Sequence, residues 1–327
     1  MTRAALLALA ICGVSGICQA GSLRGKPLAE RLSRLSQNFD GRVGACVEDR
    51  AGAVCENGNE RFSLQSVMKL IVAVAVMDRV DNRDWRMNEG LVIHKQDLSV
   101  FVQPIADLVT DQGYRTTIGD LVRRAIVDSD SAASDILMEK LGGPAAVQAF
   151  LDRKGIAGVR VDRDEKHLQT EILGLEWRSE FVAPPVFERA IAGIPEETRD
   201  AAYRRYQTDE RDTATPRGLS SFLFALASGK LVSPESTAHL LNVMAGTATF
   251  PDRLKAGVAA GWTLAHKTGT SGDWKGVTAA TNDVGILTSP DGGHFVIVVL
   301  IGDSHEPAAR RAALMAGVAR VAIANYW

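Results

Sequence analysis

The sequence predicts an α/β (α+β) protein, in which a five-stranded antiparallel sheet flanked by the terminal helices carries an inserted all-helical domain. Three observations predict this fold. Strand patterns occur near both ends of the 327-residue chain, helix patterns fill its middle, and a helix pattern lies outside the strands at each end. We therefore expect a sheet domain from residues 21–61 and 246–327, a helical domain from residues 62–245, and an active site between them.

The first twenty residues differ from the rest of the chain. Arg3 precedes an apolar stretch over residues 4–14, and small and polar residues follow as far as Ala20. This order is typical of a secretory signal peptide, so we predict cleavage after Ala20 and a periplasmic or secreted protein. The alternative is an uncleaved anchor, but the apolar stretch is short for a membrane span, so we expect no stable membrane insertion after cleavage.

The N-terminal helix and the first two strands come next. Residues 22–38 place Leu at helical spacing, and residues 42–58 predict a β-hairpin that turns between Asp49 and Gly52. If Asp49 pairs with Gly52, Cys46 lies opposite Cys55. In an oxidising compartment the two cysteines would form a disulfide. The alternative is two free, half-buried thiols, because directly opposed strand positions often give strained bridges.

The middle of the chain is helical. Residues 66–79 are almost entirely apolar and predict a buried helix. Further helices are predicted at 117–126, 131–141, 216–228 and 234–245, with Pro144 opening another after two glycines. Strands are predicted at 263–266, 277–288 and 294–301, and a final helix at 306–324.

Composition excludes several function classes. The formal net charge is −2 and no basic run occurs, which argues against nucleic acid as a partner. The six histidines show no metal-ligand spacing, so we expect no metal site and no cofactor.

Four short segments carry residues suited to acyl transfer. In Ser66-Val67-Met68-Lys69, the helical i, i+3 spacing lets Lys69 reach the Ser66 hydroxyl, and a serine needs such a neighbouring base to become a nucleophile. The other three segments are Ser129-Asp130-Ser131 between two helices, His266-Lys267-Thr268-Gly269-Thr270 at the end of a strand, and Arg163 to Gln169. Gly269 would let a substrate approach the backbone closely.

In this order, the segments resemble the motifs of the class A β-lactamases, whose signature combines Ser-x-x-Lys, Ser-Asp-Asn and Lys-Thr-Gly. The resemblance spans essentially the whole chain after the signal peptide. It implies hydrolysis of the β-lactam amide through an acyl-enzyme on Ser66, with Lys69 and Glu165 as candidate bases. It also implies that Ser129 passes a proton to the leaving nitrogen and that Glu165 activates the water that releases the acyl group.

The resemblance further implies how a small-molecule β-lactam is held. The backbone N–H groups of Ser66 and Thr270 would form the oxyanion hole. Side chains implied in substrate binding are Ser131, Gln169, Lys267, Thr268, Thr270 and, near the substrate carboxylate, Arg253. Arg163 would pair with Asp212 and close the loop that bears Glu165.

Four departures from the family pattern stand out. Ser131 replaces the asparagine of Ser-Asp-Asn, and Gln169 also replaces an asparagine. Gln65 precedes the nucleophile, where some carbapenem-hydrolysing members have cysteine. The active-site loop at about 163–212 is enlarged, because Gln169 and Asp209 are 40 positions apart, and a helix is predicted within it around 195–206. This insert either packs over the mouth of the active site and selects substrates, or is a surface excursion that leaves the site untouched.

Two other functions share these motifs. A D,D-peptidase would use the same serine on a peptide, and a penicillin-binding or sensing protein would trap the β-lactam and deacylate slowly. The segment that carries Glu165 favours hydrolysis over both. We expect a monomer.

Overall fold

The computed structural model describes residues 25–326, so the predicted signal peptide and its predicted cleavage site lie outside the described residues. One antiparallel sheet contains the strands from both ends of the chain, in the order β2-β1-β10-β9-β7. These strands are β1 (Arg42–Asp49), β2 (Gly52–Glu56), β7 (Thr263–Thr270), β9 (Val277–Thr288) and β10 (His294–Ser304). The predicted five-stranded sheet is confirmed, and a two-residue strand, β8 (Asp273–Trp274), adds to β9.

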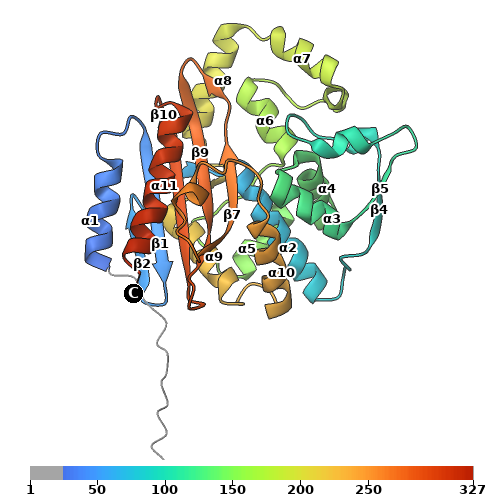
Figure 1. The fold of residues 1–327 in the computed structure, drawn as a ribbon. Coiled ribbons are helices and arrows are strands. Elements are labelled where there is room, and N and C mark those ends of the chain that lie inside the picture. The colour runs from blue at the N-terminus through green and yellow to red at the C-terminus, as the bar shows by residue number, and fades with distance from the viewer. Residues whose placement is uncertain (1–24, 327) are drawn as a thin grey trace, which may run out of the picture.

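The terminal helices α1 (Gly25–Ser36) and α11 (Ala308–Ala324) cover one face of this sheet (Figure 1). Alternate residues of β10 explain the two covered faces. Phe295, Ile297 and Val299 pack with residues of α1 and α11, whereas Val296 and Val298 belong to the core on the other face. Successive side chains of a strand point to opposite faces, so a strand that is apolar at every position is buried on both.

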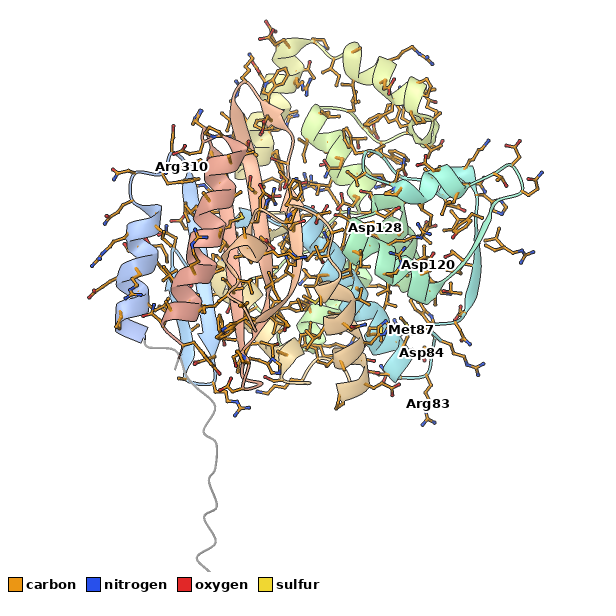
Figure 2. The ribbon with its side chains drawn as sticks, in the orientation of Figure 1. Arg83, Asp84, Met87, Asp120, Asp128 and Arg310 are labelled. Atoms are coloured by element: carbon orange, nitrogen blue, oxygen red, sulfur yellow. A yellow bond between two sulfur atoms is a disulfide. The ribbon has the colours of Figure 1, made fainter. Side chains whose placement is uncertain are left out.

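Helices fill the space beyond the second face, around the buried helix α2 (Met68–Asp81). Every residue of α2 from Met68 to Asp78 is buried. Around it lie α3 (Ile118–Arg123), α4 (Ser131–Leu141), α5 (Pro144–Arg153), α9 (Pro216–Ala227) and α10 (Pro234–Ala245). Two half-buried aspartates labelled in Figure 2 form ion pairs near the end of α3: Asp128 pairs with Arg123 and Asp120 with Arg124.

Two predicted elements have different ends in the structure. The helix predicted at 117–126 stops at Arg123, and a π-helical turn (Arg124–Asp128) follows and ends at Ser129 in the left-handed conformation, with φ 58°. Such turns are frequent at functional sites. The strand predicted at 263–266 continues to Thr270, because its partner β9 pairs with it along that whole length. Two small two-stranded sheets were not predicted, since strands of two to four residues show no clear period: β3 (Phe62–Ser63) with β6 (Thr213–Ala214), and β4 (Gly90–Ile93) with β5 (Tyr114–Thr117).

The β1–β2 hairpin has the predicted register. Asp49 pairs with Gly52 and Cys46 with Cys55, and the two cysteines form a disulfide with Cα atoms 4.1 Å apart. The disulfide alternative is therefore confirmed and the free-thiol alternative is wrong.

The enlarged loop is mostly helical. It contains α6 (Glu165–Leu173), a short 3-10 helix (Ser179–Val182), α7 (Pro184–Ala192) and α8 (Glu196–Thr208). Helices α7 and α8 lie together at the top of Figure 1, above both the sheet and the helical half. The helix predicted around 195–206 corresponds to α8, whereas α7 was not predicted. None of the helices in residues 25–326 is long and apolar enough to cross a membrane.

Candidate active site

Ser66 lies where a single 3-10 turn (Gln65–Val67) runs into α2, and it is half-buried at the edge of a cavity. Lys69 lies one turn further along and is only 1% exposed. Its Nζ donates to the Ser129 carbonyl oxygen at 2.6 Å and to Ser131 Oγ at 3.1 Å, and lies 3.4 Å from Glu165 Oε1. The described residues show no hydrogen bond between Lys69 Nζ and Ser66 Oγ, although the i, i+3 spacing led us to expect one. Two of these neighbours accept hydrogen bonds from Lys69 Nζ, and Glu165 Oε1 lies at ion-pair distance from it.

The Ser129-Asp130-Ser131 segment joins the π-helical turn to α4. Buried Asp130 caps α4 by accepting from the backbone N–H of Ala133 at 2.9 Å, and also accepts from the N–H of Ile105 at 2.7 Å. Burial raises the pKa of the Asp130 carboxyl. These bonds fix the turn that presents the Ser129 carbonyl oxygen and the Ser131 hydroxyl to Lys69.

Strand β7 brings the Lys-Thr-Gly segment to the opposite side of the site. Lys267 is fully buried, and its Nζ donates to Ser129 Oγ and to the Thr268 carbonyl oxygen, both at 2.9 Å. Burial lowers the pKa of the Lys267 ammonium well below its usual value, and the neighbouring Lys69 charge lowers it further. The Thr268 hydroxyl is hydrogen-bonded to that of Thr249 at 2.6 Å.

Gly269 allows β7 to lie directly against the nucleophile. A Cβ at this position would be 2.7 Å from the Leu64 carbonyl oxygen and 3.2 Å from the backbone nitrogen of Ser66. A side chain here would therefore push β7 away from Ser66. We expected Gly269 to make room for a substrate, and the structure shows that it makes room for the backbone before Ser66.

Arg253 contacts β7 from outside the site. Its guanidinium donates to Thr270 Oγ1 at 2.7 Å and to the Asn282 carbonyl oxygen at 2.9 Å, and it stacks on the Phe250 ring. Burial lowers the pKa of Arg253 to about 10. The arginine thus contributes positive charge next to Thr270.

Glu165 begins α6 and is 1% exposed. Asp164 caps this helix by accepting from the N–H of His167 at 2.9 Å. A second carboxyl, that of buried Asp135 on α4, accepts from the backbone N–H groups of Glu165 at 2.8 Å and of Lys166 at 3.1 Å. Burial, together with the charges of Asp164 and Glu165, raises the pKa of Asp135 to about 8. Asp135 therefore fixes the first turn of α6 and the position of Glu165.

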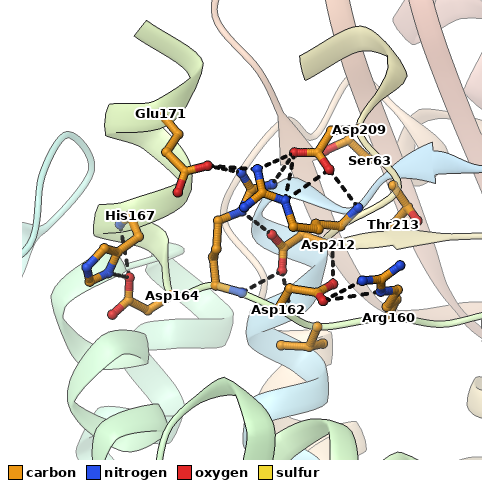
Figure 3. A network of polar contacts seen from close by, with 12 residues as sticks. Ser63, Arg160, Asp162, Asp164, His167, Glu171, Asp209, Asp212 and Thr213 are labelled. Atoms are coloured by element: carbon orange, nitrogen blue, oxygen red, sulfur yellow. Dashed lines mark hydrogen bonds and ion pairs between the residues drawn. The ribbon is translucent and has the colours of Figure 1, made fainter. Parts of the chain in front are cut away.

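Arg163 holds the start and the end of the enlarged loop together through three acidic partners, which are labelled in Figure 3. Its side chain pairs with Asp212 at 2.6 Å, Glu171 at 2.5 Å and Asp209 at 3.2 Å. Asp212 is fully buried and also accepts from the backbone N–H of Arg163 at 2.9 Å. The structure thus shows the ion pair of Arg163 with Asp212 that the resemblance implied.

The insert reaches the cavity that contains Ser66. This cavity has a volume of about 360 Å³ and is lined by Ser66, Ser131, Glu165, Gln169 and Thr270 among the residues expected in the site. The insert adds Ile191, Arg199 and Tyr203 to its wall. The insert is therefore not a surface excursion that leaves the site untouched.

Sequence patterns did not identify Asp135 or Tyr206 as parts of the site. Asp135 is an acid within a buried, mostly apolar helix, and that placement was the signal available in the sequence. Tyr206 contacts Gln65, which precedes Ser66. Such a contact across 141 positions leaves no local pattern. Among residues 25–326, no group of three or more histidine, cysteine or acidic side chains is placed to hold a metal ion.

Comparisons with known proteins agree with this geometry. A family model described as the β-lactamase enzyme family matches residues 27–327. The extended-spectrum β-lactamase PER-1 of Pseudomonas aeruginosa is 28% identical over 90% of this chain and 86% of its own length, and the β-lactamase VEB-1 of the same species is 26% identical over 90% and 88%. Among solved structures, an ancestral class A β-lactamase is 31% identical with a TM-score of 0.73, covering 91% of this chain and 99% of its own. A β-lactamase from Chitinophaga pinensis is 27% identical with a TM-score of 0.74, covering 90% and 97%.

Proposed function

This chain belongs to the β-lactamase enzyme family as a class A serine hydrolase, and we propose that it opens the β-lactam amide through an acyl-enzyme on Ser66. One observation carries this proposal. Lys69 Nζ lies within 3.4 Å of groups on Ser129, Ser131 and Glu165, and Ser66 and Glu165 line the same cavity. The groups required for acylation and deacylation thus meet around one nucleophile.

Acylation requires a base for the Ser66 proton and an acid for the leaving nitrogen. Lys69 and Glu165 are neighbours, so each can receive the Ser66 proton, directly or through water. Ser129 Oγ accepts a hydrogen bond from Lys267, which leaves the Ser129 hydroxyl proton free to move to the lactam nitrogen. Ser129 then regains a proton from the protonated base through the cluster, so one proton leaves Ser66, one is added to the lactam nitrogen, and the cluster keeps its own.

The developing negative charge and the substrate carboxylate need positive partners. We propose the backbone N–H groups of Ser66 and Thr270 as the oxyanion hole, where one such donor contributes about 3 kcal/mol to the transition state. Lys267, the Thr268 and Thr270 hydroxyls, and the Arg253 guanidinium behind Thr270 would hold the carboxylate.

Deacylation requires a water held by a base. Glu165 Oε1 is buried and accepts no hydrogen bond from the described residues, so it can still accept one from a water molecule. Gln169 donates to the other oxygen of Glu165 at 3.3 Å and also lines the cavity. We assign activation of the water to Glu165 and its orientation to Gln169.

We propose that the insert selects among β-lactams by their acyl side chain. Ile191 and Tyr203 of the insert, with Phe101, Val102 and Trp274, form a mostly apolar outer wall of the cavity. Contacts with aromatic rings hold this wall in place at both ends. Phe187 meets Phe101 edge-on at 5.3 Å, and Arg199 stacks on Trp274 at 4.0 Å.

We also propose that the enzyme acts outside the cytoplasm as a monomer. The signal-peptide pattern of residues 1–20 and the Cys46–Cys55 disulfide both support export, since disulfides persist in oxidising compartments. Mass analysis of the mature N-terminus from the periplasm should show cleavage after Ala20, and gel filtration of that protein should give one chain per particle.

The function is tested by turnover of purified residues 21–327. Benzylpenicillin should be hydrolysed with many turnovers, Lys69→Met should lose nearly all of this activity, and a peptide ending in D-Ala-D-Ala should release no D-alanine. Release of D-alanine with little hydrolysis of benzylpenicillin would instead identify a D,D-peptidase.

A further inference from the structure

A chain of hydrogen bonds connects the insert to the base that we assign to deacylation. Its second residue, after Tyr206, is Gln65, which precedes the nucleophile; the Gln65 side chain is buried and its backbone φ is 47°. Gln65 Nε2 donates to the hydroxyl of Tyr206 on α8, and Gln65 Oε1 accepts from Gln169 Nε2 at 2.9 Å. Both ends of the Gln65 amide are therefore bonded to other parts of the enlarged loop.

The second amide continues the chain to Glu165. Gln169 Nε2 carries two protons, of which one goes to Gln65 Oε1 and the other to Glu165 Oε2 at 3.3 Å. Gln169 and Glu165 lie one helical turn apart on α6. With both protons used, the amide has one orientation, and its remaining acceptor oxygen is free for a water in the cavity that Gln169 lines.

Tyr206 is the fixed end of the chain. It is 7% exposed, it packs with Leu168 and Ile172 of α6, and its hydroxyl is also bonded to Ser63 Oγ at 2.7 Å. Burial raises the pKa of Tyr206, so the hydroxyl keeps its proton throughout the usual pH range.

From this chain we propose that Tyr206 is a positioning residue for deacylation, which holds Gln65 and through it the amide of Gln169 beside Glu165. This inference rests on the proposed role of Glu165. It joins three departures from the family pattern in one device: Gln65, Gln169 and the insert that carries Tyr206. An asparagine at position 169 would be shorter by one methylene and would reach less far towards Gln65.

The test separates acylation from deacylation with benzylpenicillin. Tyr206→Phe removes the hydroxyl and keeps the packing of the ring. The loss of one such hydrogen bond should slow deacylation about five- to tenfold and leave the acylation rate within about twofold, so that acyl-enzyme accumulates in the intact mass spectrum. Ser63→Ala is the matched control, because it removes the other partner of the Tyr206 hydroxyl and leaves Gln65 bonded.

Two more variants cover the case in which Tyr206→Phe does not fold. Gln65→Leu and Gln169→Asn change the second and third residues of the chain, counted from Tyr206. Each variant should slow deacylation selectively. In the double variant Tyr206→Phe with Gln65→Leu, the effect should equal that of Gln65→Leu alone, since the hydroxyl acts through the amide.

Deacylation at the wild-type rate in folded Tyr206→Phe, or an equal fall of both rates, would overturn the proposal. A failure of the assigned mechanism looks different. If Glu165→Gln does not accumulate the acyl-enzyme, the role of Glu165 itself is wrong.

Discussion

The floor and the outer wall of the active site are built differently. The floor consists of the segments around Ser66, Ser129, Glu165 and Lys267, where charged groups are almost fully buried and bonded to one another. The insert over residues 174–208, which forms part of the outer wall, is held by aromatic contacts and by hydrogen bonds to β9, such as those of Tyr203 with Val277 and Ala279. From this difference we infer that the floor performs the reaction, and we propose that the wall selects substrates and supports deacylation.

The largest effect is expected in the floor. Ser66→Ala should reduce kcat for benzylpenicillin by about 10⁵- to 10⁶-fold, because removal of a nucleophile has effects of that size in serine hydrolases. Steady-state hydrolysis checks the loss, and thermal unfolding checks that the variant folds. Residual turnover within about a hundredfold of wild type would show that another group is acylated.

Arg163 holds the two ends of the enlarged loop together, so its loss should be the largest effect on stability. Arg163→Ala leaves Asp212 buried without its partner and should lower the free energy of unfolding by about 3–5 kcal/mol. Urea unfolding measures this change. Arg34→Ala, which breaks an exposed pair on α1, is the control and should stay within about 0.5 kcal/mol of wild type. Equal effects of the two variants would contradict the role given to Arg163.

Asp135, which holds the first turn of α6, should make the stability of the protein depend on pH. Its pKa is raised from 3.8 to about 8, so the folded state binds a proton that the unfolded state releases between these values. This contribution to stability is complete below about pH 4 and is lost as pH rises to about 8, by at most about 1.4 kcal/mol per pH unit. Relative to wild type, Asp135→Asn should therefore gain stability between pH 5 and pH 8. The prediction is wrong if the difference in unfolding free energy between Asp135→Asn and wild type is the same at pH 5 and at pH 8.

The smallest effect is expected in the wall. Ile191→Ala enlarges the cavity and should change kcat/KM for benzylpenicillin relative to 6-aminopenicillanic acid by about two- to tenfold, the scale of one lost apolar contact. Ile194→Ala is the control, because Ile194 packs in the same apolar cluster but does not line the cavity. If both variants keep the wild-type ratio, the wall does not select substrates.

The two regions also differ in how far the sequence predicted them. Ser66, Lys69, Ser129 and Lys267 occur in short motifs, because their chemistry requires particular residue types at fixed spacing on one helix, turn or strand. The sheet was predicted for a similar reason, since the strands near both ends of the chain are apolar and the β1–β2 turn sets the pairing of Cys46 with Cys55.

The contacts of the wall have no such local signature. Tyr206 reaches Gln65 and Phe187 reaches Phe101 only after the loop has folded back over the site. Asp135 was overlooked because its partners are backbone N–H groups thirty positions away, which no side-chain pattern reveals. The lack of a hydrogen bond from Lys69 to Ser66 has a similar origin, because the competing acceptors on Ser129 and Ser131 come from another part of the chain.

The most direct test of the account follows the intact mass of purified residues 21–327 after excess benzylpenicillin is added, with Glu165→Gln alongside. The account predicts that wild type consumes the drug with only a transient adduct, while Glu165→Gln keeps a stable adduct on Ser66. A lasting adduct on wild type would identify a penicillin-binding or sensing protein. Absence of an adduct from both, without consumption of the drug, would contradict the assignment of Ser66 as a nucleophile towards β-lactams.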